Sequence, residues 1–401
     1  MTFFHGIQVN EPVDGVRPIL EKSTAVIGLV ATATPGADAG AGAALDAAFP
    51  LNRAVLITDV RGAISRAGAG GTLAKSLGAI ADQGSPLVVV VRVATGVAGA
   101  GVTELEATEA NIIGSTDGST YTGLQALLAA EAQLGVRPRI IGVPGLDSQA
   151  VLEAALVVAK RLRAFVYAAC RTGAALCADR DTAVLYRGEF GDRELMLIWP
   201  EMTGWNGQAV ATALGLRAMI DERIGWHRSL SNIELAGVTG LSKDVHFDIR
   251  DASTDAGVLN AAPVTTIVRM NGYRFWGNRT TSDEPYFAFE PATRTAHALQ
   301  DVIADIEAKY MDRPMTIGLV RDMVEDGNAV LRRYAREGRI VGGSMYFDGS
   351  LNPAERLSAG KLTIDYDYTA DAPMEGLTLN QRVTSKYYSG FGDALNGGVA
   401  A

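Results

Sequence analysis

The sequence predicts an α/β domain with a doubly wound, mostly parallel sheet, joined to a C-terminal α+β domain and flanked by extended arms. Three observations support this prediction. Short runs rich in valine and isoleucine alternate with helical patterns over much of the chain, as in proteins whose parallel strands are linked by helices. After about residue 260 this alternation stops and two long amphipathic helical patterns follow. Segments near both ends alternate apolar and polar residues, which is the period of a strand.

The first part of the predicted α/β domain covers residues 22–93. Its continuous apolar runs, such as STAVIGLVA and LVVVVRV, are typical of strands buried on both faces. A helix is expected over 72–83, where Leu73, Leu77 and Ile80 recur at helical spacing. The strands are expected at 23–31, 54–57 and 87–93.

Two stretches near this part show neither a strand nor a helix pattern. Residues 34–48 are small and glycine-rich, so we expect a loop there. Residues 94–121 are polar and interrupt the alternation, which predicts a small insertion or a hairpin.

Residues 122–259 are expected to complete the α/β domain, because helices and short apolar strands alternate again. Such alternation implies βαβ units and therefore parallel strand neighbours. The expected elements are a helix at 123–134, a strand at 139–143, a helix at 148–161, a strand at 164–170, a helix at about 180–187, a strand at 194–199 and a helix at about 207–225.

Residues 260–370 are expected to form the separate α+β domain, because helices and strands occur there without βαβ alternation. The two helices are strongly amphipathic, and the last strand alternates apolar and polar side chains. The expected elements are strands at 265–270 and 275–276, helices at 293–310 and 316–338, and strands at 344–347 and 361–368.

The chain is expected to begin and end in extended arms, at residues 1–21 and 371–401. In the first arm, Ile7 and Val9 alternate with polar residues, and two prolines and a glycine break the pattern over residues 12–18. A strand so near a terminus has little chain to pair with, so it stays free or docks on another surface. The second arm shows the same alternation, at Leu377, Leu379 and Val383, before a glycine-rich tail.

Composition argues against several classes of protein. The 401 residues include 36 basic and 45 acidic side chains, a net charge of −9, whereas a nucleic-acid partner needs a dense basic surface. No apolar run approaches the ~18 residues of a membrane span, and the first residues lack the pattern of a signal peptide. We therefore expect no nucleic-acid partner, no membrane insertion, and a chain made and kept in the cytosol. Cys170 and Cys177 are expected to be ordinary thiols rather than zinc ligands or a disulfide.

The sequence lacks the motifs of an α/β enzyme. None of its glycine-rich stretches forms a phosphate-binding or dinucleotide-binding motif, and no serine-hydrolase elbow accompanies its few histidines. The acidic pairs, at 179 and 181 and at 365 and 367, fit a helix start and a solvent-facing strand. We therefore predict no enzyme, cofactor or metal, and keep an α/β enzyme as a remote alternative. The histidines are His5, His227, His246 and His297.

A cluster of arginines lies in the second long helical pattern. Residues three and four apart share one face of a helix, so Arg332, Arg336 and Arg339 are expected to lie together, opposite an apolar stripe. This face is either simply solvated or a contact for an acidic partner. The full set is Arg321, Arg332, Arg333, Arg336 and Arg339.

Stretches spread over nearly the whole chain, in order, resemble the phage tail sheath family, in particular sheaths of temperate contractile-tailed phages. Near the start these are HGIQVNEPVDGVRPILEKSTAVIGLVATA and PLNRAVLITD. In the middle is YTGLQALLAAEAQLGVRPRIIGVPG. Later stretches are NGYRFWGNRTTSDEP, which is similar to a WGNRT signature of the family, and PMTIGLVRDMVEDGNAVLRRYAREGRIVGGSMYFD.

The resemblance implies a fold and a mode of assembly. The α/β domain would have subtilisin-like topology without a catalytic triad, and the α+β domain would face a tail tube. The arms would be exchanged as strands between neighbouring subunits, through the alternating residues named above. The arginine-bearing helix would then be a candidate contact for the tube.

The resemblance also implies a function. Subunits would stack as hexameric rings around the tail tube and contract to drive it through the host envelope. The partners would be other copies of the chain, the tail tube protein, and the baseplate and tail terminator proteins. The location would be the virion tail, after assembly in the host cytoplasm. The alternative is the sheath of a phage-derived contractile injection system or an R-type bacteriocin.

Overall fold

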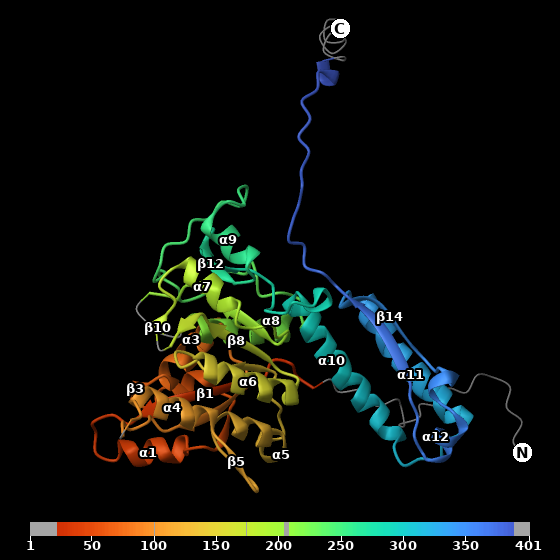
Figure 1. The fold of residues 1–401 in the computed structure, drawn as a ribbon, viewed down its shortest axis with the longest axis horizontal. Coiled ribbons are helices and arrows are strands. Elements are labelled where there is room, and N and C mark those ends of the chain that lie inside the picture. Colours follow the sequence, from red (N-terminus) through yellow and green to blue (C-terminus); the bar gives the residue numbers. More distant parts are fainter. Residues whose placement is uncertain (1–21, 100, 174, 204–207, 389–401) are drawn as a thin grey trace, which may run out of the picture.

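The computed structural model describes residues 22–99, 101–173, 175–203 and 208–388 (Figure 1). Its central sheet has seven strands. They are β1 (Ile27–Thr34), β2 (Ala54–Ile57), β3 (Gly70–Gly71), β4 (Val88–Val93), β7 (Ile140–Gly142), β8 (Phe165–Ala169) and β11 (Leu195–Ile198). The order is β11-β8-β7-β1-β4-β2, with β3 paired to β1 off this path. Strands β11, β8, β7, β1 and β4 are mutually parallel, while β2 and β3 pair antiparallel. The predicted mostly parallel sheet is confirmed.

Helices cover both faces of this sheet. Side chains around β1 alternate between two buried clusters: Ile27 and Leu29 contribute to one, Val26 and Val30 to the other. The doubly wound arrangement follows from strands that are apolar on both faces. The first face is covered by α2 (Val60–Ile64), α3 (Leu73–Gln83) and α8 (Gln208–Arg223). The second is covered by α4 (Glu104–Ile113), η1 (Gly123–Ala129), α5 (Ala130–Leu134), α6 (Gln149–Leu162) and α7 (Arg180–Arg187).

Two stretches differ from the prediction. The loop expected at 34–48 is wrong in its second half, where α1 (Ala41–Ala48) forms and buries Leu45 in the core. Alanine is the best helix former, and here it outweighs the glycines that suggested a loop. Within 94–121 the predicted hairpin is present, as β5 (Thr116–Asp117) and β6 (Thr120–Tyr121), but helix α4 precedes it. This helix begins at a Thr103–Glu106 capping box.

The expected domain boundary at residue 260 does not match the packing. The hairpin of β12 (Thr266–Arg269) and β13 (Tyr273–Trp276) buries Ile267 and Phe275 in the same cluster as α3 and α8. The Thr265 carbonyl accepts from the Trp199 N–H at 3.0 Å, and the Thr265 N–H donates to the Leu197 carbonyl at 2.9 Å. This hairpin therefore extends the large α/β unit.

The smaller unit is formed by residues 290–370 (Figure 1). Its core contains Leu299 and Ile303 from the first long helix and Leu331 and Tyr334 from the second, and Trp226 of the large unit joins it. The elements are α10 (Glu290–Glu307), η3 (Ala308–Tyr310), α11 (Ile317–Arg336), β14 (Ile340–Tyr346), η4 (Gly349–Leu351), α12 (Ala354–Ser358) and β15 (Asp365–Ala370). The two predicted helices and the predicted strands are present, although β15 begins four residues late.

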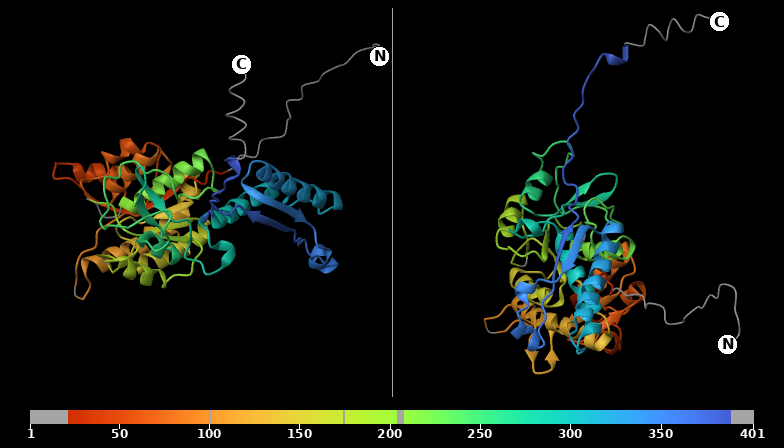
Figure 2. Two further views of the ribbon diagram at one scale, coloured as in Figure 1. Left: turned by 90° about the horizontal axis from the view of Figure 1, so that it is seen from above. Right: turned by 90° about the vertical axis from the view of Figure 1, so that its right-hand side faces the viewer.

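The change from the large to the small unit occurs within α10. Its first residues, such as Glu290 and Arg294, are buried against the large unit, and its second half carries the apolar side chains of the smaller core. The remaining short elements are β9 (Arg171–Thr172), β10 (Ala175–Leu176), α9 (Asp255–Ala261), η2 (Pro285–Phe287) and η5 (Lys386–Tyr388). After β15 the chain passes the large unit and then runs away from both units (Figure 2).

Candidate assembly surfaces

The predicted C-terminal arm is an extended segment exposed to solvent. From residue 371 to 385 it forms no helix and pairs with no strand of the described chain. Leu377 is 69%, Leu379 81% and Val383 96% exposed. Apolar side chains of an extended segment are left uncovered, which is unusual for a chain complete in itself. Ile7 and Val9, the corresponding predictions in the N-terminal arm, lie outside the described residues.

Strands β14 and β15 offer sheet edges close to where the arm leaves. They pair antiparallel, from Ile340 opposite Ala370 to Tyr346 opposite Asp365, as a sheet of two strands. Tyr366 and Tyr368 stack with ring centroids 6.4 Å apart and pack on the smaller core. Each strand has a single ladder partner within the described chain, so the outer edges retain backbone groups that an added strand would satisfy.

Three of the predicted arginines lie on the outside of α11. Arg321, Arg332 and Arg336 are exposed, and Arg332 forms an ion pair with Glu325 at 2.5 Å. Within the described residues no ion pair involves Arg321 or Arg336. Arg321 borders a groove of about 770 Å³ that is lined mainly by apolar side chains.

Arg339 does not belong to this exposed face, in contrast to the prediction. The helix ends at Arg336, so helical spacing no longer places the next arginine. The Arg339 guanidinium lies over the Trp226 ring, 4.7 Å from its centroid, and its Nε is 2.8 Å from Glu337. Arg333 is likewise half-buried over the Tyr334 ring, at 5.0 Å. These two arginines pack the smaller core rather than extending an external basic face.

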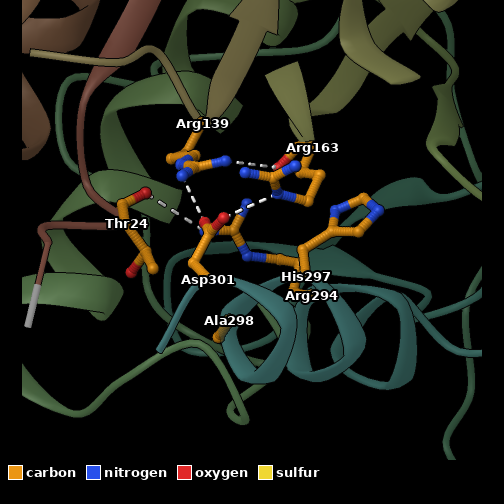
Figure 3. A pocket seen from close by; sticks show the side chains of 7 residues that line it. All are labelled: Thr24, Arg139, Arg163, Arg294, His297, Ala298 and Asp301. Atoms are coloured by element: carbon orange, nitrogen blue, oxygen red, sulfur yellow. Dashed lines mark hydrogen bonds and ion pairs between the residues drawn. The ribbon is translucent and has the colours of Figure 1, made fainter. Parts of the chain in front are cut away.

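Helix α10 is attached to the large unit by charged side chains that sequence reasoning missed (Figure 3). Asp301 of α10 pairs with Arg139 and Arg163, which come from the start of β7 and the end of α6. The Arg163 Nε lies 2.6 Å from the Asp301 carboxylate. Burial lowers the pKa of Arg139 to about 10, with Asp301 opposing the change, so the group stays charged at neutral pH. Asp301 lies far along the chain from Arg139 and Arg163, so no local sequence pattern predicts this contact.

A second charged cluster lies fully inside the same junction. Arg217 of α8 contacts Asp221 at 2.6 Å and Glu290 at 3.1 Å, and all three side chains are inaccessible to solvent. Asp221 is also paired with Arg294, and Glu290 accepts from the Tyr167 hydroxyl. Buried charges are tolerated only when each has such partners.

The start of the described chain is attached at this junction as well. Lys22 lies 3.3 Å from Asp305 of α10 and 3.4 Å from Glu131 of α5. Arg294 donates to the Thr24 carbonyl at 3.3 Å. The chain directly after the predicted N-terminal arm is therefore tied to both units before β1 begins.

Glu307, at the end of α10, predicts a pH dependence of stability. Its carboxylate oxygens are buried without a hydrogen-bond partner in the described chain. Burial raises the pKa of Glu307 from 4.5 to about 7, and repulsion from Asp326 adds to this. Because the folded chain then binds this proton more tightly than the unfolded chain, stability falls as pH rises from about 4.5 to about 7.

Glu307→Gln is therefore expected to raise the unfolding temperature at pH 8 and to change it little at pH 4. The expected gain is about 1 kcal/mol, since the half-buried site is partly screened by solvent. Thermal unfolding at both pH values measures it. Glu325→Gln, at an exposed position of α11, is the control. If Glu307→Gln raised the unfolding temperature equally at both pH values, the explanation would be wrong.

The remaining polar candidates have structural explanations. His297 is buried with its Nε2 3.8 Å from Glu194, and burial lowers its pKa. Cys170 and Cys177 are free and buried, and burial raises the pKa of both thiols. Asp179 caps α7, as predicted. Among the described residues no cluster of three or more His, Cys, Asp or Glu could hold a metal ion, and no helix is both long and apolar enough to cross a bilayer.

Comparison with family models gives two matches. The phage tail sheath protein central domain matches residues 119–281, and the domain III N-terminal region of the tail sheath protein Gp18 matches residues 24–93. The first match runs past residue 260, in agreement with the packing of the β12–β13 hairpin on the large core.

Relatives resemble the chain over almost its full length. The anti-feeding prophage baseplate in its contracted state contains a chain with the same fold, at a TM-score of 0.70 and 15% identity, covering 96% of this chain and 100% of that one. The major tail sheath protein of Serratia phage KSP20 is 43% identical, over 98% of this chain and 99% of its own. The tail sheath protein of Escherichia phage P2 is 47% identical over the same shares. These similarities show that the chain belongs to the phage tail sheath protein family.

Proposed function

We propose that this chain is the subunit of a contractile tail sheath, which polymerises as stacked hexameric rings around a tail tube and contracts to drive the tube through the host envelope. The observation that supports this most directly is the exposed, alternating C-terminal arm on a member of the sheath family. An arm of this kind is suited to join one subunit to the next. The location would be the virion tail, after assembly in the host cytoplasm.

The joining step we propose is strand exchange. Leu377, Leu379 and Val383 lie two or four residues apart, so in a strand they face the same side. Added to the edge of the β14–β15 sheet of a neighbour, the arm would pair its backbone groups and cover these side chains. Ile7 and Val9 would play the same part for the N-terminal arm. Such links would hold while the large units slide past one another during contraction.

We further propose that the large unit has subtilisin-like topology without a catalytic triad. The parallel sheet with helices on both faces supports this topology, and the lack of a serine-hydrolase motif in the sequence supports a non-enzymatic role. Residues 22–93 and 122–259 would form its core together with the β12–β13 hairpin, and 94–121 would be a small addition to it. The rest of 260–370 would face the tube, between arms at 1–21 and 371–401.

The partners we propose are other copies of the chain, the tail tube protein, and the baseplate and tail terminator proteins. The similarity to a chain of the anti-feeding prophage baseplate supports the baseplate contact. That similarity also favours a second candidate, the sheath of a contractile injection system. The greater identity to phage sheaths makes the phage role the better supported.

Negative-stain electron microscopy of the purified, concentrated chain, alone and with the tube protein, tests the proposal. Hollow tubes with a regular helical surface are expected in at least one of the two samples. A field of single particles in both samples would contradict a polymerising sheath. Sheaths that are attached to capsids when isolated from lysates would separate the phage role from an injection system.

Replacing Arg321, Arg332 and Arg336 by Glu is expected to lower co-assembly with an acidic tube by about tenfold, with little change in self-assembly. Each ion pair between an exposed arginine and an acidic group of the tube is weak and screened by salt, but the effects of three reversed charges add. Co-sedimentation with the tube protein at low and high salt measures the effect. Reversal of three exposed arginines of the large unit, Arg53, Arg66 and Arg161, is the matched control. An equal loss of co-assembly in both variants would show that the arginine face of α11 is simply solvated.

A further inference from the structure

The base of the C-terminal arm is held by the large unit, although the arm leaves from the small one. Five residues after β15, both carboxylate oxygens of Glu375 accept from Arg279. The Nε donates at 2.8 Å and the Nη2 at 2.6 Å. A bidentate pair of this kind fixes direction as well as position, because the guanidinium and the carboxylate must be coplanar.

Arg279 is itself held in a rigid segment, WGNRT. Its guanidinium lies 5.1 Å from the centroid of the Phe289 ring, and Arg279 and Phe289 form an antiparallel bridge. The next residue donates from Thr280 N–H to the Ala288 carbonyl at 2.9 Å. Gly277 has φ 141°, and a Cβ there would lie 2.8 Å from the backbone of Thr265, so glycine is required. Arg279 is thus a fixed point on the large unit.

The stretch of the arm that directly follows Glu375 is not held by either unit. Within the described chain, residues 376–385 make no hydrogen bond or ion pair to either unit, and Leu377 and Leu379 are exposed. The flexible length that precedes Leu377 is therefore set by Glu375. It is two residues when the pair is formed and seven, counted from the end of β15, when it is open.

We infer that Arg279 and Glu375 are a positioning pair that aims the C-terminal arm at the neighbouring subunit before strand exchange. This inference rests on the strand exchange proposed above. The effective concentration of a tethered segment falls with about the −3/2 power of the tether length, so shortening seven residues to two raises it by on the order of sixfold. The pair is partly exposed, with 40% and 35% of the two side chains accessible. It can therefore open, and losing it should hardly affect the folded monomer.

Spin-label distances in the monomer test directly whether the pair fixes the orientation of the C-terminal arm relative to the large unit. Labels at Thr378→Cys on the arm and Val157→Cys on α6 are expected to give a narrow distance distribution in the parent chain. Arg279→Glu or Glu375→Arg should broaden it, and the double exchange Arg279→Glu/Glu375→Arg should narrow it again. The native cysteines are buried and should label slowly. A distribution equally broad in all four chains would overturn the inference.

Polymerisation assays test whether this orientation of the arm promotes tube formation. Each single reversal is expected to raise the critical concentration for tube formation about fivefold, with the monomer unfolding temperature unchanged, and the double exchange should recover to within about twofold. High salt should reduce the difference between parent and single variants. Single variants that polymerise like the parent, or better than it, would overturn the inference, as would a double exchange no better than the singles.

A separate variant distinguishes a wrong positioning pair from a wrong strand-exchange proposal. Leu377→Ser/Leu379→Ser leaves the Arg279–Glu375 pair intact but removes the side chains that would dock. If this variant also polymerises like the parent, strand exchange through the C-terminal arm is wrong. If it fails while the charge variants assemble normally, strand exchange stands and only the positioning pair is wrong.

Discussion

Deletion of residues 371–401 is expected to give a folded monomer that forms no tubes. Among the described residues, none beyond Tyr368 belongs to the three buried clusters, and the Arg279–Glu375 ion pair lost with the arm is partly exposed, so we expect the deletion to cost little stability. It does remove the strand that we propose links neighbouring subunits. Thermal unfolding should change by no more than about 2 °C, while electron microscopy and sedimentation should show loss of polymer.

A matched pair of substitutions within the arm sharpens this expectation. Thr378→Ala/Asn380→Ala alters the residues that alternate with Leu377 and Leu379, and should leave polymerisation intact if only the leucine side docks. Leu377→Ser/Leu379→Ser should act like the deletion. Tubes of normal yield from the deleted chain would show that the C-terminal arm is not needed.

Arg217→Met is expected to destabilise the monomer by about 3–5 kcal/mol, the largest stability effect of any single change considered. The substitution leaves Asp221 and Glu290 without one of their charged partners in a site that water does not reach. Two backbone carbonyls, of Gly225 and Arg228, also lose the donors that Arg217 supplies. Chemical denaturation of the full chain at neutral pH gives the value.

Arg332→Met is the matched control, because Arg332 is also paired with a carboxylate but is 54% exposed. Its loss should cost less than about 1 kcal/mol. If Arg217→Met costs no more than this surface pair, the buried cluster does not hold α8 and α10 together in the way its geometry suggests.

The sheet was predictable because its strands are buried on both faces. Runs such as VVVVRV in β4 are apolar along almost their whole length, which few other structures allow. Helices α3, α6 and α7 were found within a residue of their predicted ends, since their apolar spacing or capping is strong. Helix α1 was missed because glycine and alanine occur together, and local composition then fails to decide between loop and helix.

The domain boundary failed for a different reason. The β12–β13 hairpin has the alternation of any antiparallel hairpin, and nothing in its sequence says which core Ile267 and Phe275 enter. That choice depends on a contact with β11, through Thr265, made across more than sixty residues of chain. A pattern read within a short window has no access to such contacts.

The candidate surfaces were predictable to a similar degree. The exposed arm follows from alternation close to a terminus, and Arg332 and Arg336 follow from helical spacing. Arg339 was assigned to the same face by extending the helical spacing to it, but the helix ends at Arg336. The pair of Arg279 and Glu375 is separated by 96 positions. Its only trace in the sequence is that Arg279 belongs to the WGNRT motif.

The attachment of the chain start at the α10 junction has a consequence for how pulling forces travel. Tension applied to the chain ahead of Lys22 reaches Asp305 and, through Thr24, Arg294, both on α10, and it also enters β1 at Ile27. The load is thus shared between a central strand and the helix that spans both units. Asp301 and Glu290 attach α10 to Arg139, beside β7, and to Arg217 of α8. A subunit pulled by its neighbour would therefore turn as one stiff body instead of stretching between its two units.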